Sequence, residues 1–124
     1  FDEVLRMLAA GNLSEPVLIV INDLDADGRD VSWLWDVNVE QLASGSSPLY
    51  TSGIRGSDMA VRLKYGGIAA ERIHPLGELA SAMDQFVETV PTGGTGYILP
   101  TYTAMLELRR MLVQRGAATA FWEQ

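Results

Sequence analysis

Cysteine is absent from the 124 residues of this chain, and histidine occurs once, as His74. The lack of cysteine excludes disulfides, thiolate metal ligands and a cysteine nucleophile supplied by this chain, and it suits a reducing compartment. A Ser-His-Asp site inside the chain would depend on His74, yet no G-x-S-x-G nucleophile elbow is present. We therefore interpret His74 as an ordinary loop residue.

Positive charge is also scarce, because the chain has 9 lysines and arginines but 16 acidic residues, which gives a net charge of −7. Such a balance argues against binding to nucleic acid, which requires a basic face. No apolar run approaches the roughly 18 residues of a transmembrane helix, and the N-terminus does not have the pattern of a signal segment. The chain begins at Phe1 without a methionine, so we expect residues 1–124 to be one domain excised from a longer protein.

Helical and strand-like segments alternate along the chain. The apolar run "VLIVI" at 17–21 has the character of a strand buried on both faces. In the last helix we expect Met105, Leu106, Leu108, Leu112 and Val113 to be buried. The alternation predicts an α/β fold with a parallel sheet flanked by helices. The predicted strands are 17–21, 48–54, 71–76 and 97–100, and the predicted helices are 1–10, 37–44, 58–66, 78–90 and 101–116.

Polar segments follow three of the predicted strands. They are residues 22–36, 52–58 and 100–103. Because ligands and partners of parallel α/β sheets gather at the carboxyl ends of the strands, we expect these segments to form the functional edge of the domain.

The segment 22–36 is rich in aspartate, and its first half resembles a calcium loop. Asp23, Asp25, Asp27 and Gly28 match the start of an EF-hand, D-x-D-x-D-G. The twelfth position should be a bidentate glutamate and is Leu34, and the loop follows a strand where an EF-hand has a helix. We therefore predict no metal site and expect these aspartates to make turns through local hydrogen bonds.

Asp30 and Asp36 are less easily explained as turn residues, because Trp33 and Trp35 lie beside them. Large aromatic side chains bury much area and would hold the loop against the domain. A carboxylate fixed in that way can orient a histidine, as the acid of a catalytic triad does. If Asp30 has that role, its histidine comes from another chain.

Signals for nucleotide binding are weak. The sequence "GGTG" at 93–96 lacks the G-x-G-x-x-G spacing, and there is no G-x-x-x-x-G-K-[ST] phosphate loop. Arg55 and Asp58 lie where a strand gives way to a helix, a place suited to anions. We favour a capping and ion-pair role for these two residues.

Three long segments together resemble a known family. They are "NDLDADGRDVSWLWDVNVE" at 22–40, "SGIRGSDMAVRLKYGG" at 52–67 and "ILPTYTAMLELRRML" at 98–112. In this order they are similar to the C-terminal domain of the MurT family, the Mur-ligase-like subunits of lipid II isoglutaminyl synthase. The resemblance implies a Rossmann-like, mainly parallel sheet of the Mur ligase C-terminal type.

The resemblance also implies an activity. Such an enzyme amidates the α-carboxylate of D-glutamate in lipid II to D-isoglutamine, using ATP and Mg²⁺, at the cytoplasmic face of the membrane. Ammonia comes from a GatD-like glutamine amidotransferase subunit, which supplies the cysteine and histidine of a triad. The family's "DGRD" motif implies that Asp30 is the third member. The implied partner interface or loop-positioning residues are Asp27, Gly28, Arg29, Ser32, Trp33 and Trp35.

The ATP-binding middle domain of a Mur ligase is missing from this sequence. We therefore expect the isolated domain to bind no cofactor by itself and to be inactive. Candidate contacts to ATP or lipid II are Asn22, Arg55, Thr101 and Tyr102. Two alternatives stay open: a non-catalytic α/β module that docks a partner, with Asp30 only a contact residue, and an unrelated domain that binds an anion or a divalent metal.

Overall fold

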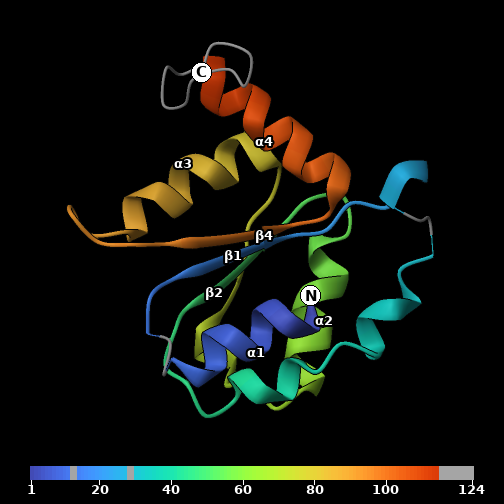
Figure 1. Cartoon of the computed structure of the whole chain (residues 1–124), viewed down its shortest axis with the longest axis vertical. Coiled ribbons are helices and arrows are strands. Elements are labelled where there is room, and N and C mark those ends of the chain that lie inside the picture. Colours follow the sequence, from blue (N-terminus) through green and yellow to red (C-terminus); the bar gives the residue numbers. More distant parts are fainter. Residues whose placement is uncertain (12–13, 28–29, 115–124) are drawn as a thin grey trace.

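The computed structural model describes residues 1–11, 14–27 and 30–114. Its centre is a four-stranded sheet in the order β3-β2-β1-β4, with every pairing parallel (Figure 1). The strands are β1 (Val17–Val20), β2 (Leu49–Ser52), β3 (Ile73–Pro75) and β4 (Tyr97–Pro100). All four lie inside the predicted strand segments, so the predicted parallel α/β fold is confirmed.

Two pairs of helices cover the two faces of this sheet. Figure 1 shows α1 (Asp2–Ala10) and α2 (Gly56–Tyr65) on one face and α3 (Leu79–Thr89) and α4 (Tyr102–Gln114) on the other. In β1 the side chains alternate between two hydrophobic clusters, as expected for successive residues of a strand. Val17 and Ile19 pack with the core on the α1/α2 side, and Leu18 and Val20 pack with that on the α3/α4 side.

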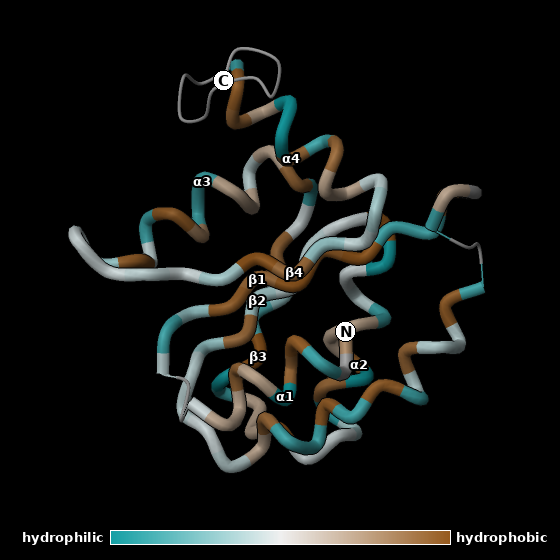
Figure 2. The backbone as a smooth tube through the Cα atoms, in the orientation of Figure 1, coloured by the Kyte–Doolittle hydropathy of each residue, from teal (hydrophilic) through white to brown (hydrophobic). Residues whose placement is uncertain are grey.

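This alternation confirms that the first strand is buried on both faces, and Figure 2 shows hydrophobic residues concentrated along the central strands. Among the residues that the structure describes, no helix is long and apolar enough to cross a membrane.

The buried face of α4 differs from the predicted one. Leu108 is buried as expected and Leu112 is half-buried, but Met105, Leu106 and Val113 are exposed. The buried stripe consists of Ala104, Leu108 and Met111, which are four and three residues apart and so share one side of a helix. We predicted the buried face from the largest apolar side chains, whereas the small Ala104 is the residue that faces the sheet.

In the described part of the chain, the connections contain four short 3₁₀ helices: η1 (Asp25–Asp27), η2 (Ser32–Trp35), η3 (Val39–Leu42) and η4 (Ala70–Arg72). The first three belong to the long connection between β1 and β2. The helix predicted at 37–44 is thus reduced to the single turn η3. This long connection includes the aspartate-rich segment 22–36, which we call the acidic loop.

Candidate functional site

The carboxyl ends of β1, β2 and β4 meet at Asn22, which follows β1 and is only 5% exposed. Its backbone N–H donates to Thr101 Oγ1 (3.0 Å), and its Nδ2 donates to Thr103 Oγ1 (3.2 Å). Its Oδ1 accepts from the backbone N–H of Ile54 (3.0 Å). The predicted convergence of the three polar segments is therefore confirmed, and one buried amide joins them.

The turn after β2 approaches β1 closely because it contains Gly53. This residue has a φ of +95°, in the left-handed region. A Cβ atom placed there would lie 2.5 Å from Ile21 O and 3.0 Å from Asn22 Oδ1. Only glycine permits both the backbone conformation and the contact.

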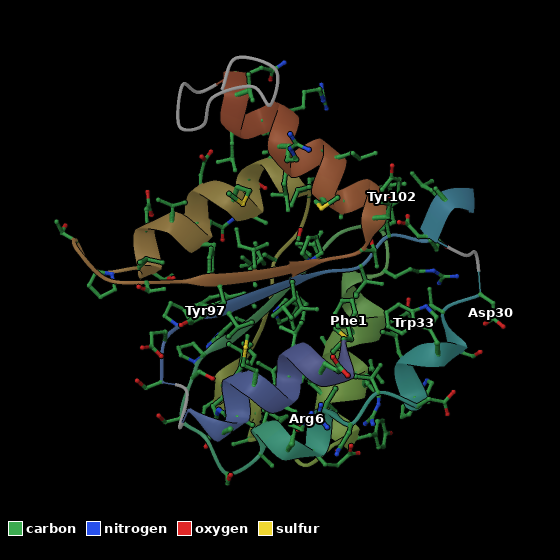
Figure 3. All side chains as sticks on the ribbon, in the orientation of Figure 1. Phe1, Arg6, Asp30, Trp33, Tyr97 and Tyr102 are labelled. Carbon is green, nitrogen blue, oxygen red and sulfur yellow. The ribbon has the colours of Figure 1, made fainter. Side chains whose placement is uncertain are left out.

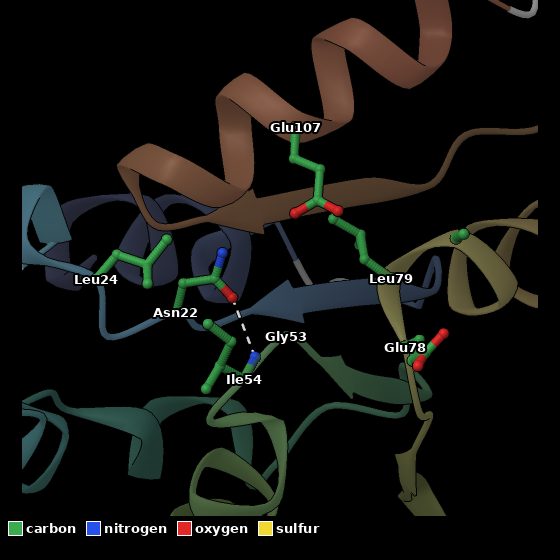
Figure 4. Close-up of a pocket in the computed structure, with 8 residues that line it drawn as sticks. Asn22, Leu24, Gly53, Ile54, Glu78, Leu79 and Glu107 are labelled. Carbon is green, nitrogen blue, oxygen red and sulfur yellow. Dashed lines mark hydrogen bonds between the residues drawn. The ribbon is translucent and has the colours of Figure 1, made fainter.

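A pocket of about 390 Å³ opens beside Asn22 (Figure 4). Its wall is largely apolar, and two carboxylates, Glu78 and Glu107, are among the residues that line it. The described lining contains no lysine, arginine or histidine. It consists of Asn22, Leu24, Gly53, Ile54, Glu78, Leu79, Ala80 and Glu107.

The candidate contacts to ATP or lipid II are mostly engaged within the domain. Arg55 Nε lies 2.8 Å from Asp23 Oδ2 and its Nη1 lies 3.2 Å from Asp58 Oδ2. The hydrogen bond that Arg55 donates to Asp23 is the main cause that raises the pKa of the arginine. Asn22 and Thr101 bond to each other, whereas Tyr102 is exposed. A pocket lined by carboxylates, with its nearby arginine neutralised, does not fit the phosphates of a nucleotide.

The ion-pair part of our interpretation of Arg55 and Asp58 is confirmed. The capping part is wrong, because Arg55 occupies the N-cap position of α2 but its side chain makes no capping bond there. Asp58 lies within that first turn, where a carboxylate interacts favourably with the helix dipole without a capping bond.

The acidic loop is anchored at its N-terminal end through Asp27. Asp27 Oδ1 accepts from the backbone N–H of Thr103 (2.7 Å), and Oδ2 accepts from the Thr103 hydroxyl and from the backbone N–H of Leu24 (3.3 Å). Thr103 is in the first turn of α4, where backbone N–H groups have no partner inside the helix. One carboxylate therefore closes the turn at η1 and binds it to α4.

The other end of the loop is anchored in the core. Trp33 is half-buried, with its ring 5.3 Å from that of Phe1, and Leu34 is buried. Trp35 points the other way and is 55% exposed, packing against the Tyr65 ring at 6.0 Å. Trp33 thus packs against the core, while Trp35 leaves much of its ring exposed.

Arg62 completes this second anchor and was not recognised in the sequence, because an arginine in an amphipathic helix is usually exposed. It is 4% exposed, and it donates to Leu34 O (2.8 Å), to Val37 O (2.7 Å) and to the Glu40 carboxylate. The pKa of Glu40 is lowered, first by its own backbone N–H and then by Arg62. The planar guanidinium also lies 5.3 Å from the Trp35 ring centroid.

Replacing Arg62 with methionine should destabilise the chain by about 2 kcal/mol, because two buried carbonyls lose their donor. Chemical denaturation would measure this loss. Arg109→Met serves as the control, since Arg109 is an exposed residue of α4. Equal stability of the two variants would show that Arg62 does not anchor the loop.

Asp30 lies between the two anchors, at the outer rim of the molecule (Figure 3). Its Oδ1 accepts from the backbone N–H of Ser32 (2.9 Å), and this bond, with a further one from the Ser32 side chain, holds the pKa of the carboxyl below its usual value. The side chain is exposed. Asp30 is therefore an oriented, ionised carboxylate at neutral pH. The neighbouring Gly28 and Arg29 lie outside the described residues.

Within the part of the chain that the structure describes, no group of three acidic or histidine side chains could hold a metal ion. Asp23 is paired with Arg55, and Asp27 is bonded to Thr103. Both aspartates act inside the fold, Asp27 by closing a turn as predicted.

Comparison with known sequences identifies the family to which this chain belongs. The sequence model described as MurT ligase C-terminal matches residues 1–105. The chain belongs to this family. The resemblance and the fold type that it implied are thereby confirmed. The matched range includes Asp30, both anchors of the loop and the Asn22 junction, by which we mean Asn22 and the residues to which it bonds.

Two relatives of this MurT C-terminal domain carry the name lipid II isoglutaminyl synthase (glutamine-hydrolyzing) subunit MurT. The protein from Streptococcus pneumoniae is 38% identical over 116 residues, which are 91% of this chain and 25% of the relative. The protein from Staphylococcus aureus (strain COL) is 26% identical over 96 residues, which are 77% of this chain and 21% of the relative. The chain spans about a quarter of the length of these curated relatives.

Proposed function

We propose that this MurT C-terminal domain is part of a synthetase subunit that converts the α-carboxylate of D-glutamate in lipid II into the carboxamide of D-isoglutamine. Ammonia for the reaction comes from glutamine, and ATP activates the carboxylate. The names of the relatives support this proposal, since they describe a glutamine-hydrolysing isoglutaminyl synthase. The reaction takes place at the cytoplasmic face of the membrane, where lipid II is assembled and ATP is available.

ATP and Mg²⁺ are assigned to the remainder of the full-length subunit. The pocket beside Asn22 is lined by Glu78 and Glu107, and Arg55 is neutralised by two aspartates. This pocket therefore does not suit the phosphates of ATP. Tyr102, which is exposed at the start of α4, is the remaining candidate for contact with a substrate.

The observation that carries the proposed role of this domain is the state of Asp30. Its carboxylate is ionised, exposed and oriented by Ser32, on a loop fixed at both ends. A cysteine-histidine pair of a glutaminase needs an acid that holds the imidazole in one tautomer. We assign Asp30 to that role in a triad whose cysteine and histidine belong to a GatD-like partner subunit.

Sharing the triad between two subunits couples their activities. The glutaminase becomes competent only when this domain is docked, so ammonia is released only next to the synthetase. Trp35 and Tyr65 offer exposed aromatic surface next to the second anchor, of the kind enriched at protein interfaces. This surface also favours the second candidate function, in which the domain only docks the partner and Asp30 is a contact residue.

Reconstitution of the full-length subunit with its GatD-like partner tests the proposal. We expect glutamate release from glutamine and conversion of the lipid II carboxylate to an amide, both dependent on the two subunits together. Mass spectrometry of lipid II and a glutamate assay would follow the two products. The isolated domain should show neither activity, and a complex that hydrolyses glutamine without amidating lipid II would refute the proposed reaction.

A further inference from the structure

We propose that Thr103 is a positioning residue for Asp30 and acts through Asp27. This inference rests on the proposed function, because it concerns how the domain delivers its carboxylate to the partner. Thr103 belongs to α4, which is otherwise a packing helix on the far side of the sheet from the second anchor. Its role follows from a chain of hydrogen bonds whose direction is fixed.

The chain begins at Ile54, whose backbone N–H can only donate and does so to Asn22 Oδ1. The amide of Asn22 is thereby oriented with Nδ2 toward Thr103, and the Thr103 hydroxyl accepts from it. A threonine hydroxyl has one proton, and a carboxylate has only acceptor positions. The hydroxyl proton of Thr103 must therefore be given to Asp27 Oδ2.

Asp30 follows Asp27 closely in the chain, so the anchor at Asp27 limits where Asp30 can lie. Two residues separate them, so their Cα atoms lie at most about 11 Å apart. From the other side, Ser32 holds the Asp30 carboxylate and Trp33 is packed against Phe1. The Asp27 anchor is made by polar groups, so loss of one hydroxyl weakens this end of the loop while the backbone bonds to the carboxylate remain.

A matched pair of substitutions isolates the hydroxyl. Thr103→Val has nearly the same shape but leaves Asn22 Nδ2 without its acceptor and Asp27 Oδ2 with only the Leu24 backbone N–H as a donor. Thr103→Ser keeps both bonds. The backbone bond from Thr103 N–H to Asp27 Oδ1 remains in both variants, so α4 keeps its first turn.

The experiment uses the full-length subunit in complex with its partner and measures kcat and KM for glutamine, together with amidation driven by added ammonium chloride. For Thr103→Val we expect kcat for glutamine hydrolysis to fall about 10- to 100-fold, since small misplacements of a catalytic group have costs of that order. KM for glutamine, affinity for the partner and ammonia-driven amidation should stay at the wild-type level. Thr103→Ser should restore kcat.

Three outcomes would overturn the inference: normal glutamine hydrolysis by Thr103→Val, equal defects in the valine and serine variants, or a parallel loss of ammonia-driven amidation. Asp30→Asn is measured beside them to separate the two proposals. If Asp30→Asn inactivates the glutaminase and Thr103→Val does not, only the role of Thr103 is refuted. If Asp30→Asn hydrolyses glutamine normally, the proposed role of Asp30 is wrong and the role of Thr103 falls with it.

Discussion

Asp30→Asn should abolish glutamine hydrolysis by the assembled complex, lowering kcat by about 10⁴-fold, the effect known for removal of the charge of a triad acid. Asparagine has the shape of aspartate, and its oxygen can still accept from the Ser32 backbone N–H. The amide lacks the negative charge, however, and its NH₂ group cannot accept the imidazole N–H. The histidine of the partner would then be held in the wrong tautomer.

Steady-state glutamate release and the affinity of the two subunits would be measured on the same samples. Asp36→Asn provides the matched control, because Asp36 is an exposed acid of the same connection. We expect the Asp36 variant to hydrolyse glutamine and the Asp30 variant to bind its partner without doing so. Normal hydrolysis by Asp30→Asn would leave the loop as a docking surface, whereas loss of binding in that variant would make Asp30 a contact residue.

Gly53→Ala should produce the largest loss of stability, about 2 to 5 kcal/mol. The left-handed conformation costs an alanine roughly 1 to 2 kcal/mol, and overpacking against fixed atoms adds about 1 to 3 kcal/mol. The atoms nearest to the new methyl group would be backbone atoms of Ile21, a buried residue just after β1, and they cannot move aside as a side chain could. The Asn22 junction would be displaced with them.

Gly67→Ala is the control for this prediction. Gly67 also has a positive φ (86°), but a Cβ atom there would meet nothing within 4 Å. Its variant should therefore lose only the conformational part, about 1 to 2 kcal/mol. Urea denaturation of both variants gives the comparison, and equal losses would mean that the contact with Ile21 has no energetic weight.

The sequence was sufficient to predict the sheet and the edge at which the site forms. An uninterrupted run such as "VLIVI" has no polar face, so it had to be a central strand, and parallel strands bring their carboxyl ends together. It was not sufficient to predict which face of α4 is buried. There, Ala104 packs against the sheet while the larger Met105 and Leu106 are exposed, a choice that depends on helix orientation.

The two anchors were beyond sequence reasoning for a different reason. Arg62 bonds to Leu34, which is 28 residues away, and Asp27 bonds to Thr103, which is 76 residues away. No local pattern records such pairs. The two tryptophans were predicted to hold the loop or line an interface. In the structure Trp33 is packed inward and Trp35 is exposed. The reason is that residues two positions apart in a 3₁₀ helix, which has three residues per turn, point to different sides.

The bond between Asp27 and Thr103 can form only late in the synthesis of this protein on the ribosome. The acidic loop emerges early, but the threonine that anchors it belongs to α4 and is synthesised much later. Until α4 has folded onto the sheet, the loop that carries Asp30 lacks one of its two anchors. If Asp30 has the proposed role, an unfinished subunit would activate the partner glutaminase poorly, and little ammonia would be released beside it.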